Sequence, residues 1–168
     1  MRKYQASFYT VIFISLLTLF ALMGCNGDQA DLIIFTSDRN GNLDLYSINP
    51  LTKEDSNLTS SSIDEFQPLV SPDKSTVAFL SEENGKTTVE TLKIIGESKD
   101  RIRVTQEPGN NHSHQWDPSG NRIAFLSEYN GSKIIYTTNL LGNRPVRLTT
   151  VKADEVGQWS PNGQNLLF

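Results

Sequence analysis

The stretch Ile33-Ile34-Phe35-Thr36-Ser37 indicates the fold most directly, because it recurs along the chain. It returns as Val77-Ala78-Phe79-Leu80-Ser81, then as Ile123-Ala124-Phe125-Leu126-Ser127 and, in part, as Leu166-Leu167-Phe168. The successive phenylalanines are 44, 46 and 43 residues apart. A nearly constant period of this length predicts a repeat architecture, in which neighbouring units stack to bury a continuous core.

Turn signals surround each apolar stretch. Three of the stretches are preceded by a proline turn, at Ser71-Pro72-Asp73, Asp117-Pro118-Ser119 and Ser160-Pro161-Asn162. Three are followed by an Asn-Gly pair, at Asn40-Gly41, Asn84-Gly85 and Asn130-Gly131. Proline presets the backbone of a turn, and Asn-Gly suits a tight hairpin because both residues tolerate a positive φ angle. Each stretch is therefore predicted to be a strand between two tight turns.

Two further strands complete each repeat. A third strand is predicted at residues 43–48, 87–94 and 133–138, and a short fourth strand ends at Leu58-Thr59, Val104-Thr105 and Leu148-Thr149. No helical periodicity competes after Cys25. Four short strands in about 40 to 50 residues are typical of a β-propeller blade. We expect an all-β chain that forms a partial propeller of about three and a half four-stranded antiparallel blades.

The predicted strands divide unevenly among the repeats. Three fall within residues 32–59, four within 64–105, four within 111–149, and two in the remaining segment. A propeller usually needs 4 to 8 blades, so these repeats do not close a ring by themselves. We expect either a piece of a longer propeller or a homodimer in which residues 154–160 serve as the missing first strand of a second copy.

The sequence motif of the repeats resembles that of the TolB-like β-propeller family, also called WD40-like Pd repeats. The resemblance rests on Ser37-Asp38-Arg39-Asn40-Gly41 with Asp44-Leu45-Tyr46, on Trp116-Asp117-Pro118-Ser119-Gly120 and on Trp159-Ser160-Pro161-Asn162-Gly163. It covers residues 32–168, an incomplete propeller. It implies a non-catalytic scaffold that binds a protein or peptide in the bacterial cell envelope. It implies no cofactor.

The N-terminus has the pattern of a bacterial export signal. Arg2 and Lys3 precede an apolar run from Val11 to Met23, which is too short to predict a membrane span. Leu22-Met23-Gly24-Cys25 resembles the lipobox of bacterial lipoproteins, which implies cleavage of residues 1–24 and attachment of acyl chains such as palmitate to Cys25. An ordinary secretory signal or an uncleaved signal anchor is the alternative.

Lipidation would leave residues 25–31 as a linker and tether the repeats to the cell membrane or the outer membrane, facing the periplasm or the cell exterior. Cys25 is the only cysteine, so an intrachain disulfide is excluded. Removal of residues 1–24 changes the formal net charge from −4 to −6, because only Arg2 and Lys3 are charged there. An acidic chain of this kind is not expected to bind nucleic acid.

A polar pair recurs ahead of each proline turn. The pairs are Asp64 and Glu65, Asn110 and Asn111, and Asp154 and Glu155. Stacked blades would present them as a polar or acidic cluster at one mouth of the central channel, where they could bind a peptide, a basic protein segment or a cation. The alternative is that they only hold the loops in place.

Histidine and tryptophan often mark sites, but here they suggest structure. His112 and His114 are two residues apart, which puts both side chains on one face of a regular strand. Two ligands do not make a zinc site, so no metal is expected. Trp116 and Trp159 recur at one repeat position, which favours core packing over an exposed contact.

No catalytic residues are predicted. The chain has no Gly-x-Ser-x-Gly motif, and no glycine-rich phosphate loop precedes a helix. Similar repeats build the propeller that covers the active site of prolyl oligopeptidases, whose catalytic residues lie in a separate domain. The alternative function is therefore a propeller segment from the front of such a peptidase.

Overall fold

The computed structural model describes residues 31–96, 98–105, 109–143 and 145–168. Residues 32–168 form one compact unit. The predicted signal peptide, Cys25 and nearly all of the predicted linker lie outside the described residues. No helix that is long and apolar enough to cross a membrane occurs within the described ranges.

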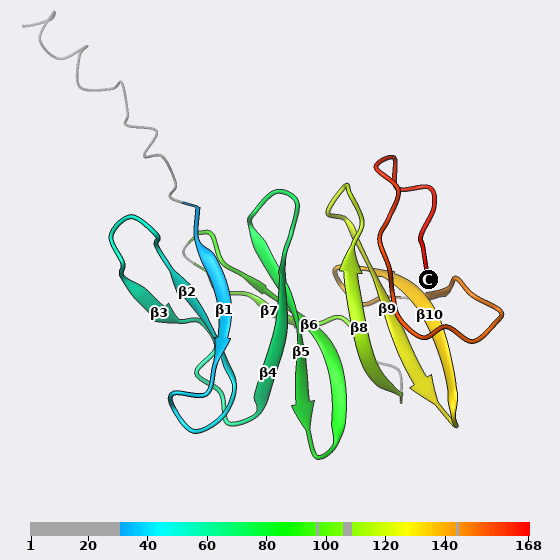
Figure 1. Ribbon diagram of the computed structural model, residues 1–168, viewed down its shortest axis with the longest axis horizontal. Coiled ribbons are helices and arrows are strands. Elements are labelled where there is room, and N and C mark those ends of the chain that lie inside the picture. The colour runs from blue at the N-terminus through cyan, green and yellow to red at the C-terminus, as the bar shows by residue number, and fades with distance from the viewer. Residues whose placement is uncertain (1–30, 97, 106–108, 144) are drawn as a thin grey trace, which may run out of the picture. The chain divides into compact units, whose positions relative to one another are not determined.

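Residues 32–168 form three consecutive antiparallel sheets (Figure 1). The first has the order β1-β2-β3, with β1 at Ile33–Ser37, β2 at Asp44–Ile48 and β3 at Asp55–Asn57. The second contains β4 (Asp64–Val70), β5 (Thr76–Glu83), β6 (Lys86–Lys93) and β7 (Arg101–Arg103) in that order. The third contains β8 (Asn110–Trp116), β9 (Arg122–Tyr129), β10 (Ser132–Asn139) and β11 (Val146–Arg147). The all-β partial propeller is confirmed.

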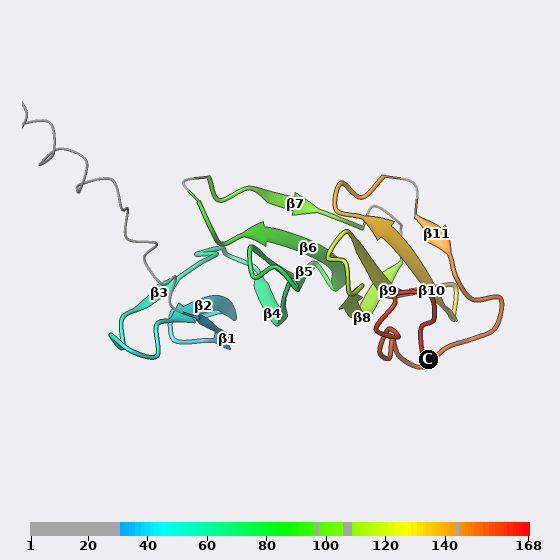
Figure 2. The same ribbon diagram turned by 90° about the horizontal axis from the view of Figure 1, so that it is seen from above.

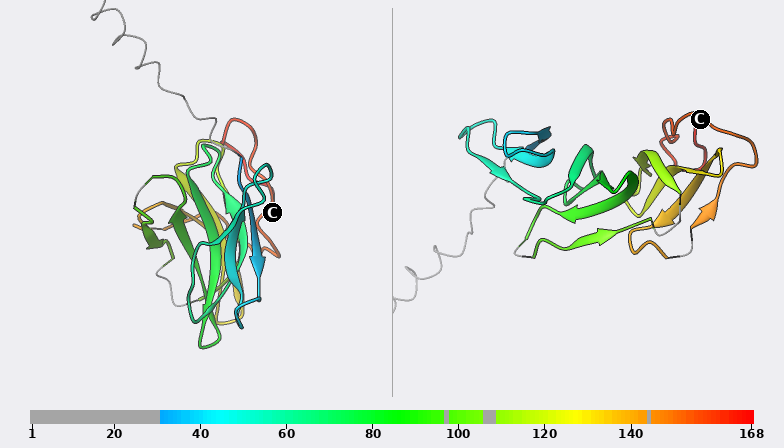
Figure 3. Two further views of the ribbon diagram at one scale, coloured as in Figure 1. Left: turned by 90° about the vertical axis from the view of Figure 1, so that its left-hand side faces the viewer. Right: turned by 90° about the horizontal axis from the view of Figure 1, so that it is seen from below.

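The sheets follow one another as blades (Figure 3). Seen from above, β1, β4 and β8 lie along one side of the molecule, and β7 and β11 lie on the other (Figure 2). We call β4 and β8 the inner strands, because each opens its blade. The fourth repeat is less regular than predicted. It forms an isolated antiparallel bridge between Trp159 and Leu166 in place of two strands.

The proline turns share one set of hydrogen bonds. The side chain of their first residue accepts from the backbone N–H five residues later, in the pairs Ser71 and Thr76 (3.0 Å), Asp117 and Arg122 (3.1 Å), and Ser160 and Asn165 (2.9 Å). The residue three positions after the first turn residue has a positive φ in each case, at Lys74, Gly120 and Gly163. The recurrent Ser/Asp-Pro pair is thus explained by the geometry of one turn.

The Asn-Gly hairpins form as predicted in two repeats. Asn84 and Gly85 have φ angles of 54° and 75°, and Asn130 and Gly131 have φ angles of 50° and 70°, the pattern of a two-residue type I′ turn. The first repeat differs, because residues 38–43 form a longer loop there. In that loop only Gly41 has a positive φ, and its N–H donates to the Asp38 carbonyl.

A threonine closes the outer edge of every sheet. The backbone N–H groups of Leu45, Val89 and Ile135 donate to the hydroxyl oxygens of Thr59, Thr105 and Thr149, at 3.1, 2.9 and 3.1 Å. The residue before each threonine donates its own N–H to the carbonyl of the same third-strand residue. The recurrent Leu-Thr ending therefore satisfies backbone groups where the fourth strand stops.

The core lies in the seams between blades. The first seam, between the first two sheets, buries Leu45, Val77, Phe79 and Leu92. The second seam, between the second and third sheets, buries Ala78, Leu80, Val89, Val104, Trp116, Ile123 and Phe125. The third seam packs Ala124, Leu126, Ile135 and Ala153 against Val156, Trp159 and Leu166. Successive residues of one strand thus face two different seams, which explains strands without polar alternation.

The prediction that His112 and His114 share a strand face is wrong. β8 has a bulge, because Asn111 pairs with Ser127 and Ser113 pairs with Leu126, which leaves His112 as the extra residue. The extra residue shifts the alternation of side chains. The side chain of His112 is 41% exposed and lies 2.9 Å from Glu128, whereas His114 is buried in the second seam. The expected packing of Trp116 in the core is confirmed.

Candidate functional site

Two of the polar pairs begin the inner strands β4 and β8, and the third begins the corresponding segment of the fourth repeat. Asp64 and Asn110 are the first residues of β4 and β8, and the proline turns follow the other ends of these strands. The Glu65 N–H donates to the Leu43 carbonyl at 2.7 Å, and the Ala153 N–H donates to the Lys133 carbonyl at 3.2 Å. Each inner segment thus begins against the third-strand region of the preceding blade.

Glu65 does not face solvent. Its side chain is fully buried, and one carboxylate oxygen accepts a hydrogen bond from the Arg101 guanidinium. Arg101 also donates to Glu90, and its guanidinium lies 5.2 Å from the centre of the Phe79 ring. Arg101 therefore links β7 to β6 and β4 across the face of the second sheet that forms the first seam. Glu65 is part of this structural network.

Glu90 is the centre of the same network. It accepts from Ser81 at 2.7 Å, and the guanidinium of Arg103 lies 3.6 Å away. Burial alone would raise the pKa of Glu90, but the hydrogen bonds from Arg101 and Ser81 and the nearby arginine charges outweigh burial and lower this pKa. The pKa of Arg101 is raised, because its two carboxylate partners outweigh its own desolvation. Both groups are charged at neutral pH.

Asn111 is also used inside the fold. Its side chain is 1% exposed, and its amide group donates to the Thr87 carbonyl at 2.7 Å and to the Thr105 hydroxyl at 3.2 Å. Both partners belong to the second sheet, so Asn111 fastens the start of β8 across the second seam. Glu65 and Asn111 occupy equivalent repeat positions, but Glu65 bonds to Arg101 within its own sheet, whereas Asn111 bonds across a seam to the preceding blade.

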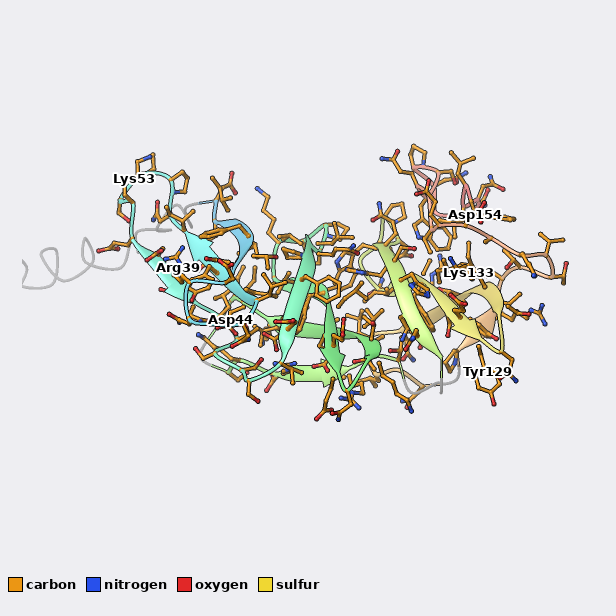
Figure 4. All side chains as sticks on the ribbon, turned by 60° about the horizontal axis from the view of Figure 1, so that its bottom comes forward. Arg39, Asp44, Lys53, Tyr129, Lys133 and Asp154 are labelled. Atoms are coloured by element: carbon orange, nitrogen blue, oxygen red, sulfur yellow. The ribbon has the colours of Figure 1, made fainter. Side chains whose placement is uncertain are left out.

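The other four residues remain accessible to a partner. Asp64 is exposed and accepts from the Leu43 N–H at 2.9 Å, Asn110 is half-buried, and Asp154 and Glu155 are exposed. Figure 4 shows Asp154 in the C-terminal segment beside the third sheet. We call these four residues the polar rim. Their carboxylate and amide oxygens can accept hydrogen bonds from lysine, arginine or backbone N–H groups of a partner.

Other polar residues of the repeat motif hold loops. Asp44 is buried and accepts from the Asn57 amide at 2.7 Å and from the Ser61 N–H at 3.1 Å. Arg39 pairs with Asp55, and its guanidinium lies 4.2 Å from the centre of the Tyr46 ring. These contacts fasten the loops of the first sheet.

Sequence reasoning missed Arg101, the cation that joins two buried carboxylates. Its repeat position holds Asp55 in the first sheet and Pro145 in the third, so no recurring residue type marked it. A lone arginine in a short edge strand gives no signal of its own. Within the described ranges, no group of three or more His, Cys, Asp and Glu side chains is placed to hold a metal ion.

The chain was compared with known families and structures. A model of the TolB beta propeller domain matches residues 58–168. No curated protein sequence matches the chain. The structure is similar to that of a putative TolB from Agrobacterium tumefaciens, with a TM-score of 0.64 and 20% identity over 79% of this chain and 51% of that one.

A second similar structure is TolB from Acinetobacter baumannii, with a TM-score of 0.67 and 20% identity over 92% of this chain and 39% of that one. The chain thus spans about half or less of the length of these two proteins. At this identity the structural likeness shows the fold alone, whereas the family model covers most of the chain. The protein belongs to the TolB β-propeller domain family.

Proposed function

We propose that this protein is a lipid-anchored, non-catalytic propeller scaffold that binds a protein or peptide of the bacterial cell envelope at its polar rim. The observation that carries the proposal is the exposure of the polar rim at the start of β4, of β8 and of the corresponding segment of the fourth repeat, in a TolB-like propeller. A scaffold of this kind needs a rigid body and an accessible surface. The seams provide the first, and the polar rim provides the second.

The chemistry of the rim favours a basic or N–H-rich partner. Asp64, Asp154 and Glu155 carry carboxylates, and the exported part of the chain has a net charge of −6 after removal of Arg2 and Lys3. Opposite charge on a partner would increase the association rate and fix its orientation more than it would increase affinity. The interaction should therefore weaken as the salt concentration rises.

The anchor is tested on Cys25. Cells that express the full chain are labelled with an alkyne analogue of palmitate, and membrane and soluble fractions are compared between wild type and Cys25→Ser. We expect label and membrane association in wild type and loss of both in the variant. Labelling that persists in Cys25→Ser, or a wild-type chain without label, would contradict the anchor.

Partner binding is tested by photo-crosslinking in cells. A benzophenone amino acid replaces Asn110 at the rim or, as a control, Lys99, which is exposed in the loop between β6 and β7 at the opposite end of the second sheet. We expect a discrete crosslinked product from position 110 that is absent from position 99. Equal products from both positions would indicate random collision rather than a binding surface. Neither replacement touches the buried seams.

A further inference from the structure

Asn-Gly pairs recur in the turns of this chain. Four of them lie within the described residues, at Asn40-Gly41, Asn84-Gly85, Asn130-Gly131 and Asn162-Gly163. An asparagine that precedes glycine is prone to spontaneous deamidation, because glycine has no side chain to shield its backbone nitrogen. That nitrogen can attack the side-chain amide of the asparagine. The four pairs share this chemistry, so the fold decides which of them react.

The reaction consumes only solvent water. The glycine nitrogen forms a bond to the side-chain carbonyl carbon of the asparagine and gives up its proton, and the side-chain amide group leaves as ammonia. The product is a five-membered succinimide ring. Water then opens the ring at either carbonyl and leaves aspartate or isoaspartate, with one added negative charge. The reaction therefore needs an exposed asparagine and a glycine nitrogen that is available to attack.

Two of the four glycine nitrogens hold a turn together. The Gly41 N–H donates to the Asp38 carbonyl at 2.9 Å, and the Gly163 N–H donates to the Ser160 carbonyl at 2.8 Å. Either nitrogen has to lose this hydrogen bond before it can attack the preceding asparagine. Both pairs are therefore protected by the turn in which they lie.

The side chain of Asn162 is fastened as well. Its carbonyl oxygen accepts from the Ser160 hydroxyl at 2.7 Å and from the Gln164 N–H at 3.1 Å. Its amide nitrogen donates to the Gln164 side chain at 3.1 Å. These bonds hold the amide group in place, so its carbon does not rotate freely towards the Gly163 nitrogen. Asn162-Gly163 is thus protected at both reacting groups.

The other two pairs form the tips of hairpins. Asn84, Gly85, Asn130 and Gly131 are all exposed. In both hairpins the ladder closes on the residues that flank the tip, so the tip nitrogens take no part in it. Within the described residues, neither glycine of these tips donates its N–H to a backbone carbonyl. Ring closure requires the asparagine to rotate out of the turn, but the attacking nitrogen has no backbone hydrogen bond to lose.

Both hairpin tips lie at the end of the blades that carries the polar rim (Figure 1). Asp64 lies opposite Glu82, which precedes the first tip by two residues. Asn110 lies opposite Glu128, which precedes the second tip by two residues. A new carboxylate at either tip therefore adds negative charge beside the rim. The aspartate product keeps the hairpin, because Asp-Gly forms the same type of turn as Asn-Gly.

We propose that Asn84-Gly85 and Asn130-Gly131 deamidate spontaneously in the folded protein, which gains negative charge beside its polar rim as it ages. The turns at Asn40-Gly41 and Asn162-Gly163 prevent the same reaction there. One event at each hairpin tip changes the formal net charge of the full chain from −4 to −6, because each event adds one negative charge.

The experiment follows each pair in the folded full chain. The protein is extracted in detergent and incubated at neutral pH in water enriched in heavy oxygen. Every new ring opening then incorporates the isotope, which separates it from earlier events. Peptide mass spectrometry gives a conversion rate for each pair. The same rates are measured in urea, because the ratio of the native rate to the unfolded rate removes the effect of the flanking residues.

The proposal predicts a contrast among the four pairs. We expect the native-to-unfolded ratio at Asn84 and Asn130 to be at least threefold higher than the ratio at Asn40 and Asn162. Equal ratios at all four pairs would overturn the proposal. A native protein that does not react at either hairpin tip, while the unfolded chain does, would overturn it as well.

A variant tests the protection directly. Ser160→Ala removes the hydroxyl that donates to the Asn162 side chain and accepts from the Asn165 N–H at 2.9 Å. We expect faster conversion at Asn162 and an unchanged rate at Asn130, which serves as the control within the same molecule. An unchanged rate at Asn162 would contradict the claim that hydrogen bonds of the turn protect this pair.

Discussion

The first and second seams fill the same repeat positions with different chemistry. Phe79 and Phe125 are both fully buried, but Glu90 lies opposite Phe79 on the neighbouring strand, whereas Tyr136 lies opposite Phe125. In the second seam the two rings stack at 5.7 Å. In the first, an arginine covers the phenylalanine and joins two buried carboxylates.

The difference shows that the blade ladder tolerates either a charged or an apolar seam. What recurs in every blade is the backbone chemistry of the turns and of the closing threonine. A polar residue in a recurring position can thus belong to a seam, as Glu65 and Asn111 do, or to the rim, as Asp64 does. Each contrast between the seams leads to a measurable consequence.

The largest effect is expected from the apolar seam. Phe125→Ala should lower the free energy of unfolding by about 3–5 kcal/mol, because it removes a fully buried ring and leaves a cavity. Phe35 holds the same repeat position at the open face of the first sheet and is only partly buried. Phe35→Ala is the matched control. Chemical denaturation of both variants should show the smaller loss for Phe35→Ala, and equal losses would mean that the first sheet is packed like the third.

The charged seam should respond strongly to loss of its cation. Arg101→Ala leaves Glu65 and Glu90 without their shared partner, and we expect a loss of about 3 kcal/mol. Arg103→Ala is the control, since the Arg103 side chain is 53% exposed and lies 3.6 Å from Glu90. It should cost under about 1 kcal/mol. Similar losses of stability in the two variants would contradict the role of Arg101 as the shared partner of Glu65 and Glu90.

Acid should weaken the second seam through His114. Burial lowers the pKa of His114 to about 4, and the nearby Ala78 carbonyl opposes this only slightly. The unfolded chain, with a pKa near 6.5, binds the proton first, so stability falls as the pH drops from about 6.5 towards 4. Because a difference of one pKa unit corresponds to about 1.36 kcal/mol, the full loss of stability is about 3 kcal/mol.

Variants isolate this effect from the carboxylates. His114→Leu should flatten stability between pH 6.5 and 5, a range above the titration of the carboxylates whose pKa values are lowered, Asp73, Glu90 and Asp117. His112→Gln, which replaces the only other histidine of the sequence, is the matched control. Thermal unfolding as a function of pH measures both, and an unchanged slope in His114→Leu would contradict the assignment.

The smallest effect is expected at a blade edge. Thr105→Val removes the hydroxyl that accepts from the Val89 N–H at 2.9 Å and from the Asn111 amide. We expect a loss of about 1–2 kcal/mol, the cost of leaving buried donors unpaired. Thr150→Val, at an exposed position, should change the unfolding midpoint little. Comparable shifts in both would show that the closing threonine is replaceable.

The strands, turns and closing threonines could be predicted because backbone geometry demands them in every repeat. Asn84 and Gly85 must both adopt a positive φ, and few other residues do so readily. The irregular structure of the fourth repeat could not be predicted in this way. The segments of this repeat carry the repeat motif, but whether they form full strands depends on packing against other parts of the fold. Here they form only the bridge between Trp159 and Leu166.

The candidate site was less predictable, because side-chain direction depends on bulges and distant partners. The bulge in β8 separates His112 from His114, and no residue type announces it. Glu65 and Asp64 are neighbours with opposite surroundings, one in a seam and one exposed. Adjacent strand residues point to opposite faces, and the partner that accommodates the buried Glu65 is Arg101, which lies 36 residues away in the sequence.

The central claim is that the polar rim binds an envelope partner. The most direct measurement compares photo-crosslinking from position 110 in wild type and in the triple variant Asp64→Asn, Asp154→Asn and Glu155→Gln, at equal expression. These substitutions keep the shape and remove the charge, so folding should be unaffected. The account predicts at least a fivefold loss of the crosslinked product. An unchanged yield would contradict it.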